Sequence, residues 1–254
     1  MEGHANMNAI TMLIRKYEME YIHFMGIECL PEYKIVTKDI DLARADSQGF
    51  TAPATAQYNR DTGEHTLEIW PLGMNLDGAP LIFHEFTHML DAEKYSYKNH
   101  VKYIANKGFT EYHASQVDLL KRLGQKSINS PISFSMKDTI EYFGKIITIE
   151  EFVGIAHSTA CELISRSNFP SNVETLSTTL GLIFNYLGRR SICIMYAADY
   201  KDMFDDSMFS KLVGTAPFSL IKNLMTRWLD DKTVAVIDGL FFKLISTLIQ
   251  EYQL

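Results

Sequence analysis

Two histidines and a glutamate in the stretch LIFHEFTHML, residues 81–90, have the types and the spacing for metal-dependent chemistry. On an α-helix, residues four apart lie on the same face, so His84 and His88 can both aim an imidazole nitrogen at one point. Glu85 lies one position round the helix, where its carboxylate can reach a metal-bound water. This H-E-x-x-H spacing is typical of metallohydrolases, in which the histidines bind zinc and the glutamate is the general base.

The residues around this motif indicate a buried helix. A neutral histidine is tolerated in a protein core, but burial of an unpaired glutamate is strongly unfavourable. A metal site therefore explains Glu85, whereas the alternative of a core histidine with incidental polar neighbours leaves its carboxylate unexplained. The apolar side chains that surround the motif are Leu81, Ile82, Phe83, Phe86, Met89 and Leu90.

A catalytic zinc takes three protein ligands and keeps a fourth position open. Glu111 is the first candidate for the third ligand, because it begins the next long predicted helix. Ala114 and Ser115 share its face of that helix. A small side chain there lets the two helices approach each other, and Ser115 could add a supporting hydrogen bond.

Three nearby residues are further candidates for the site. Asp91 shares the helical face of His88 and could ligate the metal, although we favour it as an acceptor for a histidine N–H or as an orienter of the Glu111 helix. His113 lies two residues from Glu111, so the two side chains cannot share one metal. His113 and Tyr112 are instead candidate donors to the oxyanion that forms during hydrolysis.

The elements that must position these residues follow from periodicity and turn signals. Apolar residues at helical spacing predict a helix over residues 6–25, and PEYKIVTKD predicts a short strand. The stretch TAPATAQYNRDTGEHTLEIWP, residues 51–71, predicts a β-hairpin in whose second arm Leu67 and Ile69 share one face of the strand. The hairpin then leads into the loop NLDGAP and the helix that carries the motif.

The helix of the motif is expected to begin at Pro80 and to end near Glu93 or Tyr95. A short helix follows, and Gly108 ends it. Thr110 is expected to cap the helix of Glu111, which Gly124 closes.

A polar, proline-containing connector after Gly124 marks the predicted domain boundary. Residues 1–125 form the half that carries the motif, and residues 126–254 are predicted to be entirely helical. Capping-box spacing predicts helix starts at Thr148 and Ser171. The fold class is therefore α+β and mostly helical, with a small antiparallel sheet or hairpin packed on the H-E-x-x-H helix and an all-α second half.

Composition narrows the class of protein. The chain has 254 residues, of which 46% are hydrophobic and 22% charged, so it can bury a sizeable core. A net charge of -7 disfavours direct binding of nucleic acid. Three widely spaced cysteines predict reduced thiols. The start of the chain lacks the pattern of a signal peptide, and charged residues interrupt the most apolar segment, so we expect a soluble cytoplasmic protein without a membrane partner.

The motif HEFTH followed by EYHA, preceded by a helix and a hairpin, resembles the ImmA/IrrE-like small gluzincin metallopeptidases of bacteria and mobile elements. The resemblance covers about residues 6–124. It implies a zincin-like fold in which His84, His88 and Glu111 hold one zinc ion and Glu85 is the base. It also implies that the HTLEIW arm is the edge strand on which an extended substrate pairs.

Two features depart from this resemblance. Thr87 stands where family members often have glycine, and no proline ends the apolar run after EYHA. The stretch HEFTHMLD also resembles the lethal-factor-like peptidases, which have an aspartate at the position of Asp91.

The sequence predicts a zinc-dependent metallopeptidase that hydrolyses a peptide bond in a protein or peptide substrate, with Glu85 activating the water. Some proteins of the resembling group act on, or bind, DNA-binding repressors, so a repressor is one candidate partner. The alternative is a regulatory metal-binding protein without catalysis, which docks such a partner through residues 126–254.

Overall fold

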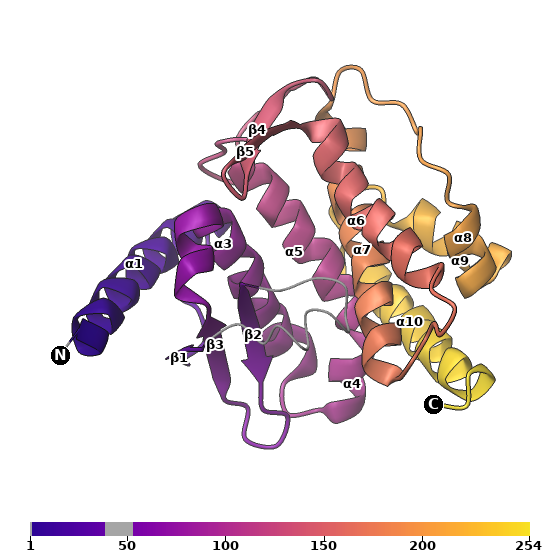
Figure 1. Ribbon diagram of the computed structural model, residues 1–254, viewed down its shortest axis with the longest axis horizontal. Coiled ribbons are helices and arrows are strands. Elements are labelled where there is room, and N and C mark those ends of the chain that lie inside the picture. The colour runs from indigo at the N-terminus through magenta and orange to yellow at the C-terminus, as the bar shows by residue number, and fades with distance from the viewer. Residues whose placement is uncertain (1, 39–52) are drawn as a thin grey trace.

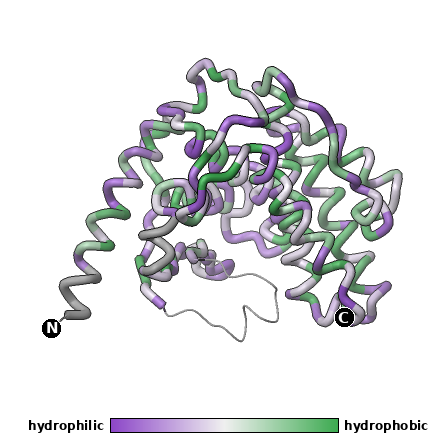
Figure 2. The backbone as a smooth tube through the Cα atoms, turned by 45° about the horizontal axis from the view of Figure 1, so that its top comes forward, coloured by the Kyte–Doolittle hydropathy of each residue, from purple (hydrophilic) through white to green (hydrophobic). Residues whose placement is uncertain are grey.

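The computed structural model describes residues 2–38 and 53–254, with no side chains described for residues 2–7 and 72–76. Within these residues the chain is mostly helical and carries a small mixed sheet, so the predicted α+β class is confirmed (Figure 1). Apolar and polar stretches alternate along most of the helices, as expected of helices that bury one face (Figure 2).

The first helix, α1 (Glu2–Met25), matches the predicted helix and leads away from the rest of the molecule toward the N-terminus (Figure 1). Its inner face packs on the helix of the metal-binding motif. Tyr21 and Phe24 make edge contacts with the ring of Phe83, at centroid distances of 5.2 and 5.5 Å. Tyr21 also donates a hydrogen bond to Thr87, so α1 supports the back of the motif.

The sheet contains the predicted strand and the predicted hairpin, but it is mixed and not antiparallel as expected, because β1 and β3 are parallel. Its strands are β1 (Tyr33–Thr37), β2 (Ala54–Tyr58) and β3 (His65–Ile69), in the order β1-β3-β2. In β3, Leu67 and Ile69 share one face as predicted, and both are buried. β3 is parallel to β1 and antiparallel to β2. The expectation that the HTLEIW arm is an edge strand is therefore wrong, because β1 pairs with its other side. Among the strands that the structure describes, β2 lies at an edge of the sheet.

The helix of the motif begins earlier than expected. α3 extends from Pro71 to Ser96 and is broken by non-helical dihedral angles at Gly78. The predicted loop at residues 75–80 is wrong, because only this one kink interrupts the helix. A Cβ atom at Gly78 would lie 2.9 Å from the hydroxyl of Tyr17, so the kink brings the α3 backbone close to α1. Pro80 lies in the first turn after the kink, where its missing N–H costs nothing.

Two helices follow: α4 (His100–Ala105) and α5 (Lys107–Arg122). Gly108 and Thr110 lie inside α5, so the expectations that they end one helix and cap the next are wrong. A Cβ atom at Gly108 would lie 2.6 Å from the ring of Phe241. The glycine is therefore explained by close packing between helices.

The second half of the chain is not entirely helical, which corrects the prediction. Strands β4 (Thr139–Tyr142) and β5 (Lys145–Thr148) form a hairpin before the helices begin. The capping box of Thr148 and Glu151 is confirmed, whereas Asn172 caps the next helix in place of Ser171. The remaining elements are α6 (Ile149–Ile164), α7 (Val173–Tyr196), α8 (Ser207–Val213), α9 (Thr215–Leu224) and α10 (Asp231–Glu251).

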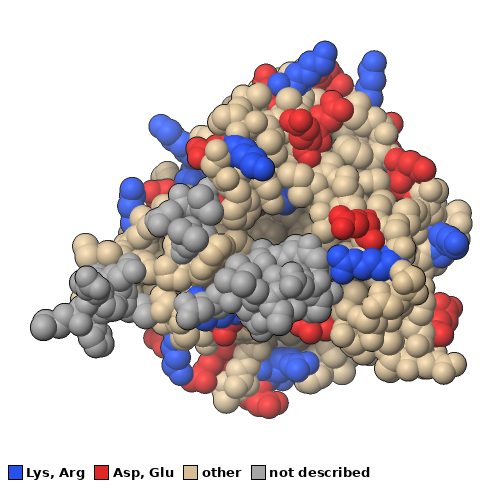
Figure 3. All heavy atoms as spheres, in the orientation of Figure 1, with Lys and Arg blue, Asp and Glu red and all other residues tan. Residues whose placement is uncertain are grey.

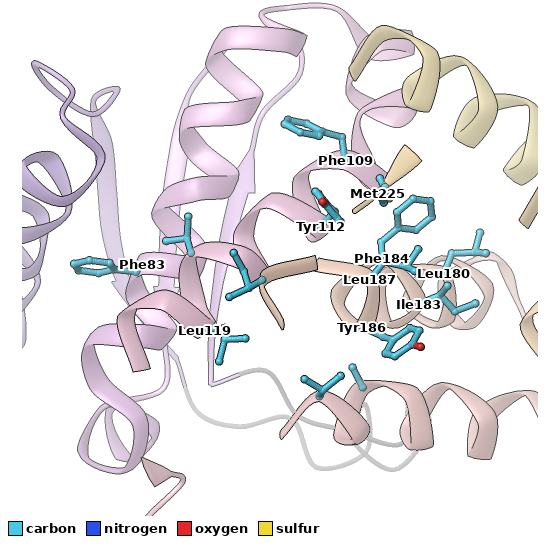
Figure 4. Close-up of a cluster of buried hydrophobic side chains, with 14 of the residues drawn as sticks. Phe83, Phe109, Tyr112, Leu119, Leu180, Ile183, Phe184, Tyr186, Leu187 and Met225 are labelled. Atoms are coloured by element: carbon cyan, nitrogen blue, oxygen red, sulfur yellow. The ribbon is translucent and has the colours of Figure 1, made fainter. Parts of the chain in front are cut away.

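α5 occupies the centre of the molecule, packed between α3 and α7. Side chains of α5 and α7, among them Tyr112, Leu119 and Leu187, belong to one continuous apolar cluster (Figure 4). Gly188 makes this approach possible, because a Cβ atom there would lie 2.2 Å from the carbonyl oxygen of Tyr112. The core therefore runs through both halves of the chain, and the division into domains at residues 125 and 126 stays a prediction.

A buried group of charges ties the start of α3 to the centre of the molecule. Arg122 pairs with Asp77, next to the kink, and with Asp118 at 2.9 Å. Its guanidinium lies 5.0 Å from the ring centroids of Tyr142 and Phe152. Because buried charges are costly unless they are paired, this group fixes where α3 starts relative to α5 and the β4–β5 hairpin.

Among the described helices, α10 alone is long and apolar enough to cross a membrane by length and composition. Core helices can pass the same test, so one such helix is weak evidence for a membrane span. The buried side chains of α10 pack on α4, α5 and α9.

Candidate metal centre

The segment of α3 after the kink presents both histidines of the motif to one point. The ring centroids of His84 and His88 are 4.7 Å apart, and each side chain is 17% exposed. The ligand atoms of these histidines and of Glu85 all lie within 4.8 Å of one another. This group could therefore hold a metal ion, as the sequence predicted.

Glu111 reaches the same point from α5. Its Oε2 atom lies 3.7 Å from Nε2 of His84 and 3.7 Å from Nε2 of His88. Gly181 of α7 lies behind this carboxylate, since a Cβ atom there would be 3.6 Å from the Glu111 carboxyl carbon. Three donor atoms from two neighbouring helices thus surround one position.

Thr110 holds the ring of His88 in place. Its hydroxyl lies 2.8 Å from Nδ1 of His88, on the side of the ring away from Glu111. A hydrogen bond to one ring nitrogen fixes the orientation of the imidazole and leaves the other nitrogen for a metal. From the sequence, Thr110 was expected to cap a helix. Its position next to Glu111 was the only signal in the sequence for the contact with His88.

The pKa values of the residues in the site depend on burial and on the neighbouring charges. Burial lowers the pKa of His88 to about 3, so this imidazole is neutral at pH 7. Burial opposes ionisation of Glu111, but the two imidazoles and the Lys107 ammonium outweigh it and lower the pKa of Glu111 to about 2. Burial also opposes protonation of His84, yet the Glu111 and Glu85 carboxylates outweigh it and raise its pKa. A metal ion must displace the proton that His84 tends to hold.

Glu85 lies beside the ligands and points toward the sheet. Its Oε2 atom accepts a hydrogen bond of 2.6 Å from the backbone N–H of Ala56 in β2. Burial raises the pKa of Glu85 to about 7, although His84 and the Ala56 hydrogen bond oppose this shift. A carboxylate with a pKa near neutrality suits a group that takes up a proton and releases it again.

A cavity of about 300 Å³ opens in front of these side chains. Its walls come from β2, α3, the α4–α5 junction and, from the second half of the chain, α7 and α10. Besides the four residues of the site, the lining includes Ala54, Ala56, Tyr58, Tyr103, Lys107, Thr110, Ser177, Thr178, Gly181, Leu182, Asn185 and Phe241. The helical half therefore forms one wall of the site.

The β2 edge presents backbone groups to this cavity. The N–H of Asn59 donates to the carbonyl oxygen of Glu64 at 2.9 Å, and the carbonyl oxygen of Pro53 accepts from the N–H of Trp70 at 2.7 Å. In an antiparallel ladder the groups of alternate residues point outward, so Ala54, Ala56 and Tyr58 direct their N–H and C=O groups away from β3. The hydrogen bond from Ala56 to Glu85 agrees with this alternation.

Asp91 and His113 form a separate pair. Nδ1 of His113 lies 3.0 and 3.1 Å from the two carboxylate oxygens of Asp91. The His113 ring stacks on Phe109 and meets Trp228 edge-on. Asp91 thus accepts a hydrogen bond from His113 and links α3 to α5, which was one of the roles expected for it. Neither Asp91 nor His113 lines the cavity. Asp91 therefore does not lie among the candidate metal ligands, and His113 does not lie where it could donate to an oxyanion in the cavity.

Tyr112 and Ser115 also lie away from the cavity. The Tyr112 hydroxyl is buried and donates a hydrogen bond of 2.5 Å to the carbonyl oxygen of Arg227. Ser115 donates to Oδ1 of Asn185 at 2.7 Å and so joins α5 to α7. The predicted oxyanion role of Tyr112 is not supported, because its hydroxyl bonds to Arg227 and Tyr112 does not line the cavity. Ser115 supports the helix of Glu111 rather than a ligand directly.

A scan against protein-family models, a search of curated proteins and a search of solved structures each found no match to this chain. The functional argument therefore depends on the geometry of the site.

Proposed function

We propose that this chain is a zinc-dependent metallopeptidase in which His84, His88 and Glu111 hold one zinc ion and Glu85 is the general base. The observation that carries the proposal is the equal distance of 3.7 Å from the Glu111 carboxylate to both imidazole nitrogens. The ImmA/IrrE-like family and a zincin-like fold of residues 1–125 belong to the same proposal.

The donor set fits zinc in type and in spacing. Two imidazoles and one carboxylate are common zinc ligands, and three protein ligands leave one position open, as in catalytic sites. Donors bonded to a tetrahedral zinc at about 2.0–2.1 Å are about 3.3 Å apart. The observed 3.7 Å therefore needs only a small inward movement of side chains.

A zinc ion held there supplies Lewis-acid chemistry and a water nucleophile at neutral pH. Glu85 takes a proton during the attack on the scissile carbonyl and later delivers it to the leaving amine. The partly enclosed cavity limits access of bulk water, which strengthens the electrostatic interactions within it.

The β2 edge accounts for the recognition of a peptide backbone. An extended peptide can pair with the outward groups of Ala54 and Tyr58 as an added strand. The N–H of Ala56 is used by Glu85, which places the base directly beside such a strand. This arrangement transfers the substrate-binding role from β3, where the sequence placed it, to β2.

The decisive experiment compares Glu85→Gln with the wild type, both loaded with zinc. We expect the variant to keep one zinc ion per chain and to lose cleavage of unfolded casein by about 10²–10⁴-fold, the range for a general base. Glu93→Gln, on the same helix but outside the cavity, is the control and should cleave normally. Normal cleavage by Glu85→Gln, or zinc bound with four protein ligands, would contradict the proposal.

A further inference from the structure

One charged side chain of the cavity has no part in the chemistry described so far. Lys107 is the first residue of α5 and lines the cavity one helical turn before Glu111. A cation at the N-terminus of a helix interacts unfavourably with the helix dipole, and the short helix α4 before α5 reduces this effect only in part. The position of Lys107 is therefore not explained by the stability of its own helix.

Lys107 forms no close salt bridge among the residues that the structure describes, although its ammonium attracts the Glu111 and Glu85 carboxylates at longer range. No carboxylate of residues 2–38 or 53–254 lies within 4.0 Å of its ammonium. Its nearest recorded aromatic neighbour is Tyr103, whose ring centroid is 5.1 Å from Nζ. The guanidinium of Arg60 lies 5.8 Å from the centroid of the same ring. Two cations thus lie near the Tyr103 ring, and of these Lys107 lines the cavity.

The charges that line the cavity favour an anionic ligand once a metal is bound. Among the described lining residues, Glu85 and Glu111 supply the negative charges and Lys107 is the only lysine or arginine. With a divalent cation the formal sum is +2 + 1 − 2 = +1. A partly enclosed site with a net positive charge concentrates anions.

We propose that Lys107 binds a carboxylate of the substrate, with Tyr103 as a positioning residue that supports its ammonium. This inference rests on the proposed peptidase function and specifies its substrates as acidic peptides or peptides with a free C-terminus nearby. Tyr103 stacks on Tyr58 with centroids 5.4 Å apart, so the cation lies at the Tyr58 end of the β2 edge.

The direction of the bound peptide decides which carboxylate reaches Lys107. A peptide antiparallel to β2 places residues on the N-terminal side of the scissile bond near Tyr58, and the carboxylate is then an Asp or Glu side chain. A parallel peptide places its C-terminal side there, and the carboxylate can be the chain terminus. Both sources present the same chemistry to Lys107.

The test uses zinc-loaded full-length protein and a synthetic peptide library made in two forms, one with free C-termini and one synthesised with C-terminal amides. Cleaved bonds are identified by mass spectrometry for the wild type, Lys107→Gln and Lys107→Glu. We expect the wild type to favour carboxylate-bearing peptides by about tenfold, a typical effect of one close charge pair. Lys107→Gln should lose this preference and Lys107→Glu should favour Lys or Arg. Loss of preference on amidation identifies the C-terminus, and persistence identifies a side chain.

Two controls separate the preference from folding. Lys102→Gln removes an exposed lysine of α4 that does not line the cavity and should behave as the wild type. Lys107→Arg keeps the charge and should keep the preference. All variants should fold and bind one zinc ion per chain, because the substitutions leave His84, His88 and Glu111 in place.

A second measurement distinguishes failure of this inference from failure of the proposed function. Fluorescein-labelled peptides that differ only by Glu or Gln are titrated into zinc-loaded Glu85→Gln protein, with and without Lys107→Gln. Cleavage by the wild type without a charge preference overturns the carboxylate site and leaves the peptidase intact. No cleavage, together with Lys107-dependent binding of the Glu peptide, overturns the peptidase and keeps the carboxylate site.

Discussion

The interface between α3 and α5 holds two clusters of histidine and carboxylate that differ in their surroundings. In one, Glu111 lies 3.7 Å from each of two imidazoles and faces a cavity of about 300 Å³. In the other, His113 lies 3.0 Å from Asp91 and is covered by aromatic rings. The residue types are the same, so the type alone does not distinguish a metal centre from a structural pair.

The difference is whether the polar atoms already have partners. The Asp91–His113 distance is that of a hydrogen bond, so these atoms satisfy each other. The Glu111 carboxylate lies 3.7 Å from each imidazole, which is too long for a good hydrogen bond, so an ion placed between these atoms could bind all three. Acidic and basic side chains are interspersed on the face shown in Figure 3, so no broad field of one sign singles out the site on that face.

The largest expected effect separates the two clusters by metal affinity. Glu111→Gln should weaken zinc binding by more than about 100-fold, because a ligand contributes more than the 10–100-fold of an outer hydrogen-bonding group. Asp91→Asn should leave zinc affinity unchanged. Competition with a chromophoric chelator measures both. Equal affinity of Glu111→Gln and the wild type would show that Glu111 is not a ligand.

The Asp91 cluster should instead matter for stability. Asp91→Ala leaves the His113 N–H without its acceptor in a part-buried place, at a cost of about 1–3 kcal/mol in the free energy of unfolding. Urea denaturation of zinc-free protein measures this difference. Asp61→Ala, in the exposed hairpin turn, should change it by less than about 0.5 kcal/mol. If Asp91→Ala lowered zinc affinity without loss of stability, the two clusters would not be separate.

A smaller effect sharpens the description of the metal centre. Thr110→Val keeps the shape of the side chain but removes the hydroxyl next to Nδ1 of His88, and should weaken zinc binding by about 10–100-fold. Thr87→Val is the matched control, since Thr87 lies inside the motif but hydrogen-bonds to Phe83 and Tyr21. Its zinc affinity should be normal even if its stability falls. Identical affinities for both variants would contradict the role of Thr110.

The smallest effect concerns pH and a carboxylate near the Asp91 cluster. Burial raises the pKa of Asp238 from 3.8 to about 6, against a weak opposing hydrogen bond from Asn106. Since the folded state holds this proton more tightly than the unfolded state, the stability contributed by Asp238 falls as pH rises from about 4 to about 6. Asp238→Asn should therefore raise Tm at pH 7 by about 2 °C and leave it unchanged at pH 3.5. An equal change of Tm at both pH values would refute this assignment.

Local sequence patterns predicted which helices and strands form more reliably than where these elements end or which elements pack against them. The helix of α1, the β2–β3 hairpin and the capping box of Thr148 are confirmed, because each depends on residues close in the sequence. Gly108 was taken as a helix end but lies inside α5, where the missing side chain leaves room for the ring of Phe241. A sequence pattern shows where a helix can break, whereas close packing elsewhere can explain the same glycine.

The same distinction applies to the candidate site: relations within one helix follow from the sequence, and relations between elements do not. The sequence alone placed His84 and His88 on one face with Glu85 one position round from it, because 3.6 residues per turn fixes that relation within any α-helix. Only the tertiary structure decided that Glu111 meets them, that β2 rather than β3 is the edge beside Glu85, and that α7 closes the cavity. These relations depend on how closely separate elements pack, which is set by side-chain volumes contributed from distant parts of the chain.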